Sequence, residues 1–517
     1  MSLALVKRVG RLENLQARAS TGFSAAALTR LTNDWTTSTL SADAQARNDL
    51  RTLIARTRDL RDNNDYAKKF VGMAEGGIVG NSGVHFKNKA KDPDRVQGNK
   101  LIPGPLDIFA NKQIEDAKWE WGKKENCTVT GELSLCDVEK IVLGSCITDG
   151  GILVRGVRGY DNPFRFALQL FEVDYIDFDM NVPRTARGTE IRMGVEFDEW
   201  GRRLNYYLFK RNPNDSYYGL ETWGQRHVVL PARDIIHPFV KYRSRQTHGI
   251  PWLVTPAQRL KMLSRYEDSE LIASTVAAQK MGFMKTTGDV QYQGDTDAAG
   301  NKIMDAEPGS FEILPAGLEL QSWDPQHPNA NYQAVHKCWL RGAAAGLNVA
   351  YHTLGNDMEA VNFASGMIGL GEERDNWMRL QNWFIEDFEE PIHSQWLEAA
   401  ILTGQVALPM SKFRKFNAPM FSGRRWDFVN PSVEMDALDR RLKLRLTSIT
   451  RELAKQNIDR DELFQEIEDD QKEMEKRKIT PLDVIETLAK AKVVGGEAEE
   501  PPKPEVRGQG KEAAAAA

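Results

Sequence analysis

The chain has little cysteine, with only Cys127, Cys136, Cys146 and Cys338 among its 517 residues. No two of these form a CxxC pair, and the gaps of nine and ten residues between the first three match no common zinc module. The pattern therefore favours reduced, packed thiols over a metal site or a disulfide framework.

Long apolar runs are also missing. No stretch reaches the roughly 18 consecutive apolar residues that a membrane-spanning helix needs. The first residues, MSLALVKRVGRLENL, hold one short apolar patch that Lys7, Arg8 and Arg11 interrupt, which is not the pattern of a secretory signal. We expect a protein with no membrane span that stays in the cytoplasm in which it is made.

The motifs of the common enzyme classes are not found. The chain has no GxxxxGK[ST] phosphate loop, and its nearest glycine cluster, residues 76–83, follows a predicted helix and lacks the Lys-Ser pair. HExxH and GxSxG do not occur, and no carboxylate pair stands out as an acid–base couple. Only His237 and His248 invite attention among eight scattered histidines, and a structural role is favoured for them. We expect no enzymatic activity, no cofactor and no metal.

A basic excess is absent too, since 68 basic residues face 73 acidic ones and the net charge is −5. A protein that grips DNA gains most of its affinity by neutralising phosphates and releasing counterions. This chain therefore either never meets DNA or meets DNA without holding it.

The composition, 41% hydrophobic and 27% charged, is that of a soluble globular protein, and the length suggests two to four domains. The first half predicts helices and then strands. A helix should begin at Ser41 and stop at Asn63-Asn64, and a second should run from Tyr66 to about Ala74 and end at Gly76-Gly77. The remaining predictions are a loop at 87–104, helices over 105–150 and short strands over 151–240.

The second half predicts longer helices. Thr255 should cap a helix over 255–281, with Pro256 in its first turn. Turns and short strands follow over 285–326, then a helix near 329–347 and a loop at 348–362. A long helix over 363–403 should kink at Pro391. Residues 432–494 are charged and helical, and the tail 495–517 is disordered by composition. The class is α+β.

Several of these segments, in this order, resemble the portal proteins of lambda-type tailed phages over roughly residues 20–475. The resemblance is carried by RTLIARTRDLRDNNDYAKKFV with IVGNSGVHF, LQLFEVDYID, GVEFDEWGRRLNYYLF, DIIHPFVKYRSRQTHGIPWL, PGSFEILPAGLELQSWDPQHPNANYQAV, LGNDMEAVNFASGMIGLGEERDNW and PIHSQWLEAAILTG. One departure lies in residues 362–367, where Asn-Phe-Ala-Ser and Met367 stand in place of the family's usual Asn-Tyr-Ser-Ser and a following Arg.

The resemblance implies a portal fold and a ring of identical subunits, typically about twelve, at one capsid vertex. The fold would comprise a mixed α/β wing, a two-helix stem, a small β-containing clip, a long kinked wing helix and a helical crown. On this chain the parts would be an N-terminal segment and wing at 1–254, stem helices at 255–283 and 329–347, a clip at 284–328, a channel loop at 348–362, the wing helix and following segment at 363–431, a crown at 432–494 and a disordered tail at 495–517.

The same resemblance implies a conduit for double-stranded DNA during packaging and ejection. The implied partners are the large terminase ATPase, the major capsid protein and the head–tail connector or adaptor protein. The protein would lie in the virion at the portal vertex after assembly in the host cytoplasm. The alternative is another structural head or connector protein of a tailed phage. An enzyme of the packaging motor is disfavoured because no phosphate loop is present.

The predicted clip is strongly acidic, with Lys302 as its single basic residue between positions 286 and 326. A ring of subunits would multiply this excess into a negative collar that repels passing DNA; a solvated acidic loop is the simpler interpretation. We assign docking of the terminase or adaptor to Asp289, Asp295, Asp297, Asp305 and Glu307. The candidate channel residues facing DNA are Glu267, Asp268 and Glu270 on the first stem helix and His352, Asn356, Asp357 and Glu359 in the loop.

Basic residues gather in two places, residues 51–69 and residues 233–245. Ion pairing across subunit interfaces is the favoured role for them, and contact with DNA packed around the wing is the alternative. The residues concerned are Arg51, Arg56, Arg58, Arg61, Lys68, Lys69, Arg233, Lys241, Arg243 and Arg245.

Overall fold

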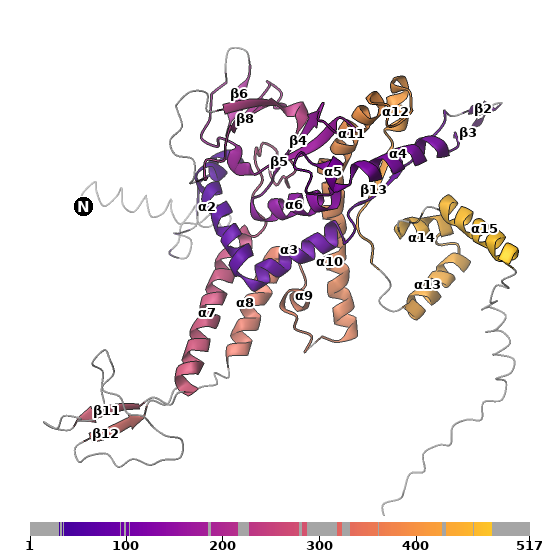
Figure 1. Ribbon diagram of the computed structural model, residues 1–517. Helices are drawn as coiled ribbons and strands as arrows, with labels where there is room; N and C mark the ends of the chain where they lie inside the picture. Colours follow the sequence, from indigo (N-terminus) through magenta and orange to yellow (C-terminus); the bar gives the residue numbers. More distant parts are fainter. Residues whose placement is uncertain are drawn as a thin grey trace, which may run out of the picture. The chain divides into compact units, whose positions relative to one another are not determined.

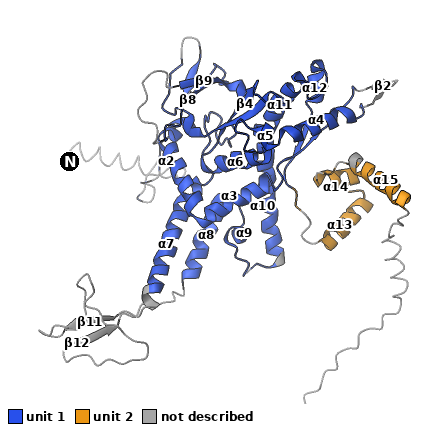
Figure 2. Ribbon diagram, viewed as in Figure 1, with its two compact units in different colours: residues 1–424 blue, residues 425–517 orange. Residues whose placement is uncertain are grey.

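The computed structural model describes residues 30, 34, 36–93, 95–97, 100–102, 104–184, 188–215, 227–278, 282–286, 318–322, 331–359, 361–426, 431–456, 458 and 460–477. The chain divides into two units, residues 1–424 and 425–517 (Figure 2). The first combines helices with small antiparallel sheets, and the described part of the second is helical. The predicted α+β class is confirmed.

Two helices open the first unit. Helix α2 (Ala42–Asn63) begins after Ser41, whose Oγ accepts a hydrogen bond from the Ala44 amide at 3.2 Å, as predicted. Asn64 separates it from α3 (Asp65–Ile78). The predicted end of this second helix at Gly76-Gly77 is wrong. A Cβ on Gly77 would lie 2.8 Å from the Trp377 ring, so this glycine serves close packing against a later helix instead of ending its own.

The next segment holds α4 (Ile108–Trp121), α5 (Lys124–Cys127) and α6 (Leu135–Thr148), which confirms the helices expected over 105–150. Strand β1 (His85–Asn88) pairs with β13 (Pro419–Ser422), more than 300 residues later in the sequence. A short hairpin of β2 (Arg95–Gln97) and β3 (Lys100–Ile102) lies within the predicted loop 87–104. The loop prediction is therefore wrong in part.

Two antiparallel sheets occupy the region in which strands were expected. Strand β4 (Leu153–Arg158) lies between β5 (Phe166–Phe171) and β10 (Ile235–Ile236). The second sheet has the order β6 (Glu190–Arg192), β7 (Val195–Phe197), β8 (Arg203–Phe209) and β9 (His227–Pro231), with short 3-10 turns at Val173–Tyr175 and Ala232–Asp234. Side chains from both sheets and from α2 share one apolar core, which includes Leu50, Leu153, Val195 and Leu208.

Two helices then pack side by side, α7 (Val254–Ala278) and α8 (Tyr332–Leu347) (Figure 1). Because α7 begins at Val254, Thr255 lies inside the helix and is not the predicted cap. Between them in sequence, β11 (Gly282–Thr286) and β12 (Leu318–Ser322) form an antiparallel hairpin. The rest of the predicted segment 285–326 falls outside the described residues.

The long helix predicted over 363–403 is three consecutive pieces. Helix α10 (Phe363–Phe384) leads into a π-helical turn, η4 (Ile385–Glu389), and then α11 (Glu390–Leu402). Pro391 lies in the first turn of α11, and the Glu390 amide reaches five residues back to the Ile385 carbonyl. The irregularity expected at Pro391 is thus a wider turn just before it. The first unit continues with η5 (Met410–Lys412) and α12 (Phe413–Phe416).

The second unit, by itself, consists of α13 (Pro431–Lys443), α14 (Ile449–Lys455) and α15 (Arg460–Arg477). This confirms the helical prediction for 432–494 as far as residue 477. Residues 478–494 and the predicted disordered tail 495–517 lie outside the described part. No residue described between 431 and 477 is buried. Across both units, no helix within the described ranges is long and apolar enough to cross a membrane.

The two histidines noted in the sequence form a buried pair with ring centroids 5.5 Å apart, beside Arg203. Burial, together with the Arg203 charge, lowers the pKa of His248 to about 4 and that of His237 well below its usual value. The unfolded chain takes up these protons near pH 6.5, before the native state does. The contribution of these two neutral histidines to the free energy of unfolding is therefore fully present above pH 6.5 and is lost as the pH falls toward 4.

We predict that the free energy of unfolding, measured with urea, falls as the pH is lowered from 7 to below 4, with about 3 kcal/mol lost from His248 once both its native and unfolded forms are protonated. H248Q, whose amide can still donate to the Met193 carbonyl, should keep its stability at pH 7 and lose less on acidification. Equal pH slopes for the two proteins would contradict this.

Candidate functional site

The channel candidates that the structure describes lie on α7, at the positions predicted for the first stem helix, and in the segment that follows α8. We call α7 and α8 the stem pair. The two helices run antiparallel and approach closely at small residues. A Cβ on Gly342 would lie 2.1 Å from the Arg259 guanidinium, and one on Gly346 would lie 3.3 Å from Thr255. The glycines of α8 therefore let the side chains of α7 lie directly on its backbone.

Glu267 lies between three helices and does not point freely to solvent. Its Oε1 is 2.6 Å from His336 Nε2 on α8 and accepts a hydrogen bond from the Tyr66 hydroxyl of α3 at 3.2 Å. Burial, reinforced by the Glu267 charge, raises the pKa of Tyr66. This carboxylate therefore joins the stem pair to the body of the unit.

The other two acidic candidates on α7 have different surroundings. Asp268 is exposed, and Glu270 is partly exposed near the stacked rings of Tyr266 and Tyr332, whose centroids are 5.6 Å apart. Burial, then the charge of Glu267, raises the pKa of Tyr332, and Glu270 adds to this. Asp268 is the candidate on α7 that the structure leaves exposed to solvent.

The segment 348–362, predicted as a loop, contains a short helix, α9 (Tyr351–Gly355), and a turn at Asn356 in the left-handed region with φ 52°. The loop prediction is wrong here because α9 is held by burial of Leu354 and by hydrogen bonds to Glu373. Leu354 is buried, and Glu373 of α10 accepts hydrogen bonds from the Ala350 amide at 3.2 Å and the Thr353 hydroxyl at 2.6 Å.

Two of the four candidates in this segment, Asp357 and Glu359, come together after α9, and a third, Asn356, has a different partner. The Lys337 ammonium of α8 lies 3.1 Å from Asp357 and 2.9 Å from Glu359, and the Tyr351 hydroxyl donates to Asp357 at 2.7 Å. The Tyr351 hydrogen bond and then Lys337 lower the pKa of Asp357 to about 2. Lys69 of α3 donates to Asn356 Oδ1. We call Lys337, Asp357 and Glu359 the stem clamp.

His352, the fourth candidate, is separate from the stem clamp. A Cβ on Gly369 of α10 would lie 2.8 Å from its ring, so the imidazole packs on the α10 backbone. Its Nε2 is buried and has no hydrogen-bond partner within the part of the chain that the structure describes. The geometry gives His352 a packing role at the α9–α10 contact.

The clip candidates Asp289, Asp295, Asp297, Asp305 and Glu307 lie outside the described residues. The hairpin β11–β12 does place Glu319 opposite Lys285, so one acidic residue of this region has a basic cross-strand neighbour.

Several of the basic residues proposed for subunit contacts are paired inside the chain. Arg58 of α2 makes a half-buried ion pair with Asp149 at 2.8 Å and with Asp174. Arg51 lies 2.8 Å from Asp179. These contacts hold α2 against the neighbouring elements of its own unit.

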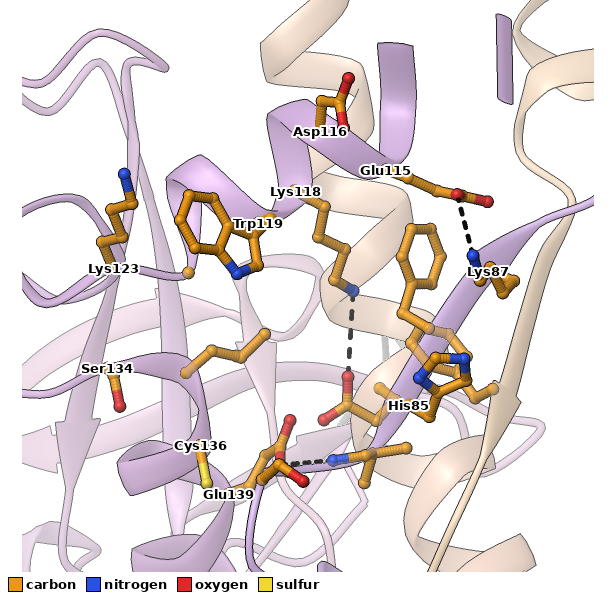
Figure 3. A pocket seen from close by; sticks show the side chains of 18 residues that line it. His85, Lys87, Glu115, Asp116, Lys118, Trp119, Lys123, Ser134, Cys136 and Glu139 are labelled. Atoms are coloured by element: carbon orange, nitrogen blue, oxygen red, sulfur yellow. Dashed lines mark hydrogen bonds and ion pairs between the residues drawn. The ribbon is translucent and has the colours of Figure 1, made fainter. Parts of the chain in front are cut away.

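Sequence reasoning missed a buried polar centre that joins α4, α6 and η4 (Figure 3). Lys118 Nζ lies 3.9 Å from Glu389 Oε2, a distance too long for a hydrogen bond, and the two side chains are 4% and 1% exposed. Burial raises the pKa of the Glu389 and Glu139 carboxyl groups, and the charge of Glu389 raises the pKa of Glu139 further. The three residues of this centre, Lys118, Glu139 and Glu389, lie far apart in the sequence and match no motif. Among the described residues, no group of three or more His, Cys, Asp or Glu could hold a metal ion.

Large apolar side chains are exposed along the stem pair. Leu271 and Ile272 of α7 are 69% and 64% exposed, and Trp339 of α8 is 40% exposed. Met262 of α7 and Val335 of α8 are exposed as well. We call these five residues the stem apolar surface.

The chain matches the family model for the phage portal protein, lambda family, over residues 28–381. It is 29% identical over 455 residues to the protein named "Probable portal protein" of Halomonas phage phiHAP-1, with 87% of this chain and 86% of that protein covered. It is 21% identical to Portal protein B of Escherichia phage lambda, with 79% and 81% covered.

A chain of the virion of a native gene transfer agent particle also aligns with this one. The TM-score is 0.41 and the identity 11%, with 79% of this chain and 93% of that chain covered.

We predict that K337M loosens the stem clamp without unfolding the protein, because it leaves Asp357 and Glu359 without their shared cation. Hydrogen exchange of residues 356–359, followed by mass spectrometry, should accelerate several-fold. Since the pKa of Asp357 is about 2, the effect should be the same at pH 5 and pH 7.5. K472M, which removes a surface ion pair with Glu468 in the second unit, serves as the control. Unchanged exchange in K337M would show that Tyr351 alone holds the turn.

Proposed function

The chain belongs to the lambda family of phage portal proteins, and from this membership we propose that it forms a ring at one capsid vertex through which double-stranded DNA is packaged and ejected. The ring would also be the docking platform for the large terminase ATPase and then for the head–tail connector, with the major capsid protein around it. Family membership sets aside the alternative of another head or connector protein. The proposal requires no catalytic step by this chain.

The stem apolar surface is the observation that carries ring formation. Leu271 and Ile272 are exposed on α7, although the same helix also packs on α8 and α2. Large apolar side chains gathered on a helical arm are typical of a protein–protein contact. When the stem apolar surface of one copy contacts a different surface of the next copy, the contact is head-to-tail. Such contacts close into a ring if the rotation between neighbouring copies fits.

The second unit supports assembly independently. Its residues described between 431 and 477 include none that is buried, and they expose large apolar side chains by half or more, at Val433, Ile449 and Phe464 in the helices and at Leu444 and Leu446 between α13 and α14. Helices of this length gain most of their stability from burying an apolar face. We propose that 432–494 forms the crown, in which copies of these helices cover one another.

For the passage of DNA, we assign α7 and α8 to the stem, the residues between them to the clip and 348–362 to the channel segment. The channel-facing residues are then Asp268 and the acidic members of the stem clamp, with Asn356 beside them. Lys337 balances part of the negative charge of Asp357 and Glu359. A cation that is paired with carboxylates makes fewer lasting phosphate contacts, so DNA would move past Lys337 with little salt-dependent friction. Docking of the terminase or adaptor is assigned to the acidic residues of the clip.

We predict that L271E/I272E abolishes or strongly weakens ring formation. Burial of each side chain contributes about 1.5–3 kcal/mol, so losing both weakens a subunit contact by roughly 100-fold or more. Light scattering and negative-stain images of the purified protein should show monomers where the wild type forms rings with a central hole. W200E changes an 80% exposed side chain outside the stem and should leave rings intact. Normal rings from L271E/I272E would refute the assigned interface, and monomeric wild type would refute ring formation itself.

We predict that D357N/E359Q assembles normally but retains DNA more strongly. Lys337 would lose both acidic partners and become available to phosphates in every subunit. Binding of linear duplex DNA to purified rings should rise, and it should fall more steeply between 50 and 200 mM salt than in the wild type. D161N, at a 98% exposed site outside the stem, is the control. Identical salt dependence in all three proteins would remove these residues from the channel wall.

A further inference from the structure

A pocket of about 620 Å³ adjoins the buried polar centre, and the three side chains of that centre are part of its lining (Figure 3). The rings of Phe86, Trp119 and Phe421 line it as well. Trp119 is 71% exposed, so the pocket is open to solvent on its side. One water molecule takes up roughly 30 Å³ in the liquid, whereas pockets of this size and aromatic lining hold small organic groups.

Two buried polar atoms at this pocket have no hydrogen-bond partner among the residues that the structure describes. They are Nζ of Lys118, which is a donor, and Oε1 of Glu389, which is an acceptor. The two side chains are only 4% and 1% exposed. Buried polar atoms without partners are uncommon, so we expect both to be met by a group that enters from the pocket.

The neighbouring groups leave these two atoms unused. Lys118 Nζ lies 4.6 Å from the ring centroids of both Phe86 and Phe421, and a ring face attracts an ammonium without replacing an oxygen acceptor. The third side chain of the centre, Glu139, is already held by the Val84 amide, which donates to its Oε2 at 2.9 Å. One donor, on Lys118, and one acceptor, on Glu389, therefore remain for a ligand.

A ligand that satisfies both atoms has to accept from Lys118 and donate to Glu389. A carboxylate accepts but cannot donate, and it would bring a further negative charge beside two carboxyl groups. An ammonium donates but offers Lys118 no acceptor. A primary carboxamide carries a carbonyl oxygen and an NH₂ group side by side and has no charge. A hydroxyl group does both through a single oxygen, but it lacks the flat surface that packs on aromatic rings.

We propose that this pocket binds a primary carboxamide, the group that ends an asparagine or glutamine side chain and many small organic amides. The carbonyl oxygen accepts a hydrogen bond from Lys118 Nζ, and the NH₂ group donates one to Glu389 Oε1. The rest of the ligand packs on the rings of Phe86, Trp119 and Phe421. No covalent bond changes and no proton is exchanged. Binding at this pocket does not depend on ring formation.

The proposal is tested with benzamide, benzoate, benzamidinium and benzyl alcohol, which carry different polar groups on the same phenyl ring. Saturation-transfer NMR titrations at pH 7 give the dissociation constant of each for the full-length chain, both as assembled wild type and as L271E/I272E. Benzamide should bind saturably and at least tenfold more tightly than the other three. Benzoate cannot donate, benzamidinium cannot accept, and benzyl alcohol presents one oxygen in place of two polar atoms.

Two results of these titrations would overturn the proposal. One is the absence of benzamide binding to both protein forms, which would mean that water alone solvates Lys118 and Glu389. The other is binding of benzoate, benzamidinium or benzyl alcohol that is as tight as that of benzamide, because the pocket would then not require a donor and an acceptor together.

Variants locate the binding at this pocket. K118M/E389M removes the donor and the acceptor together and leaves neither charge buried alone, so it should keep its fold, checked by circular dichroism, and lose at least tenfold in benzamide affinity. W119A removes an exposed part of the lining and should weaken binding several-fold. E125Q, at an exposed site on α5 outside the pocket, should bind as the wild type does. Unchanged affinity in folded K118M/E389M, or in W119A where K118M/E389M does not fold, would refute the assignment.

The comparison of the two protein forms also identifies the source of the carboxamide. Benzamide binding to the L271E/I272E monomer alone would indicate that an asparagine or glutamine side chain of a neighbouring copy fills the pocket in the ring. Equal binding to both forms would indicate a separate amide-bearing molecule. Light scattering reports ring formation separately from ligand binding, so failure of the proposed function and failure of this proposal give different results.

Discussion

The buried contact of Lys118 with Glu389 constrains how the first unit is built. Lys118 belongs to an early helix and Glu389 to the turn between α10 and α11, so the pair joins segments about 270 residues apart in sequence. Removing one partner of such a pair leaves an uncompensated buried charge, which costs about 3–5 kcal/mol. The pairing of β1 with β13 and the Phe86–Phe421 ring contact, at 5.2 Å, enclose the same ion pair. The late helices are therefore part of the core of the early ones.

This arrangement explains how the stem pair is supported. Helix α10 packs on α3 through Trp377 at Gly77, and α3 in turn contacts the stem through Tyr66 and Glu267. The buried polar centre, α10, α3 and the stem thus form a continuous series of packed contacts. A π-helical turn, which is weaker than an α-helical one, lies at the point where this series meets the buried charges.

Local sequence signals predicted the elements that depend on neighbouring residues. Ser41 and Asn64 mark helix boundaries by side-chain hydrogen bonds a few residues away, and these boundaries were predicted correctly. The predictions that were wrong depend on distant partners. Gly77 resembles a helix end in the sequence, but in the fold it lies against the Trp377 ring inside the helix. The segment of α9 resembles a loop in the sequence, because the contacts of Glu373 and Leu354 that hold the helix are not part of local propensity. Lys118, Glu139 and Glu389 give no signal in sequence because their spacing is set by the tertiary fold.

The charges of the stem region show why net charge alone was a poor guide to the site. Four of the described channel candidates are tied to a named partner: Glu267 to His336, Asn356 to Lys69, and Asp357 and Glu359 to Lys337. An exposed ion pair adds little to stability, because solvent screens it and two long side chains are ordered to make it. Its effect here is to occupy Lys337 with two carboxylates. If this segment lines a channel, as we propose, Lys337 is then not offered to a passing polyanion. Under that proposal, the pairing of each lysine with an acidic neighbour constrains the wall more directly than an overall negative charge does.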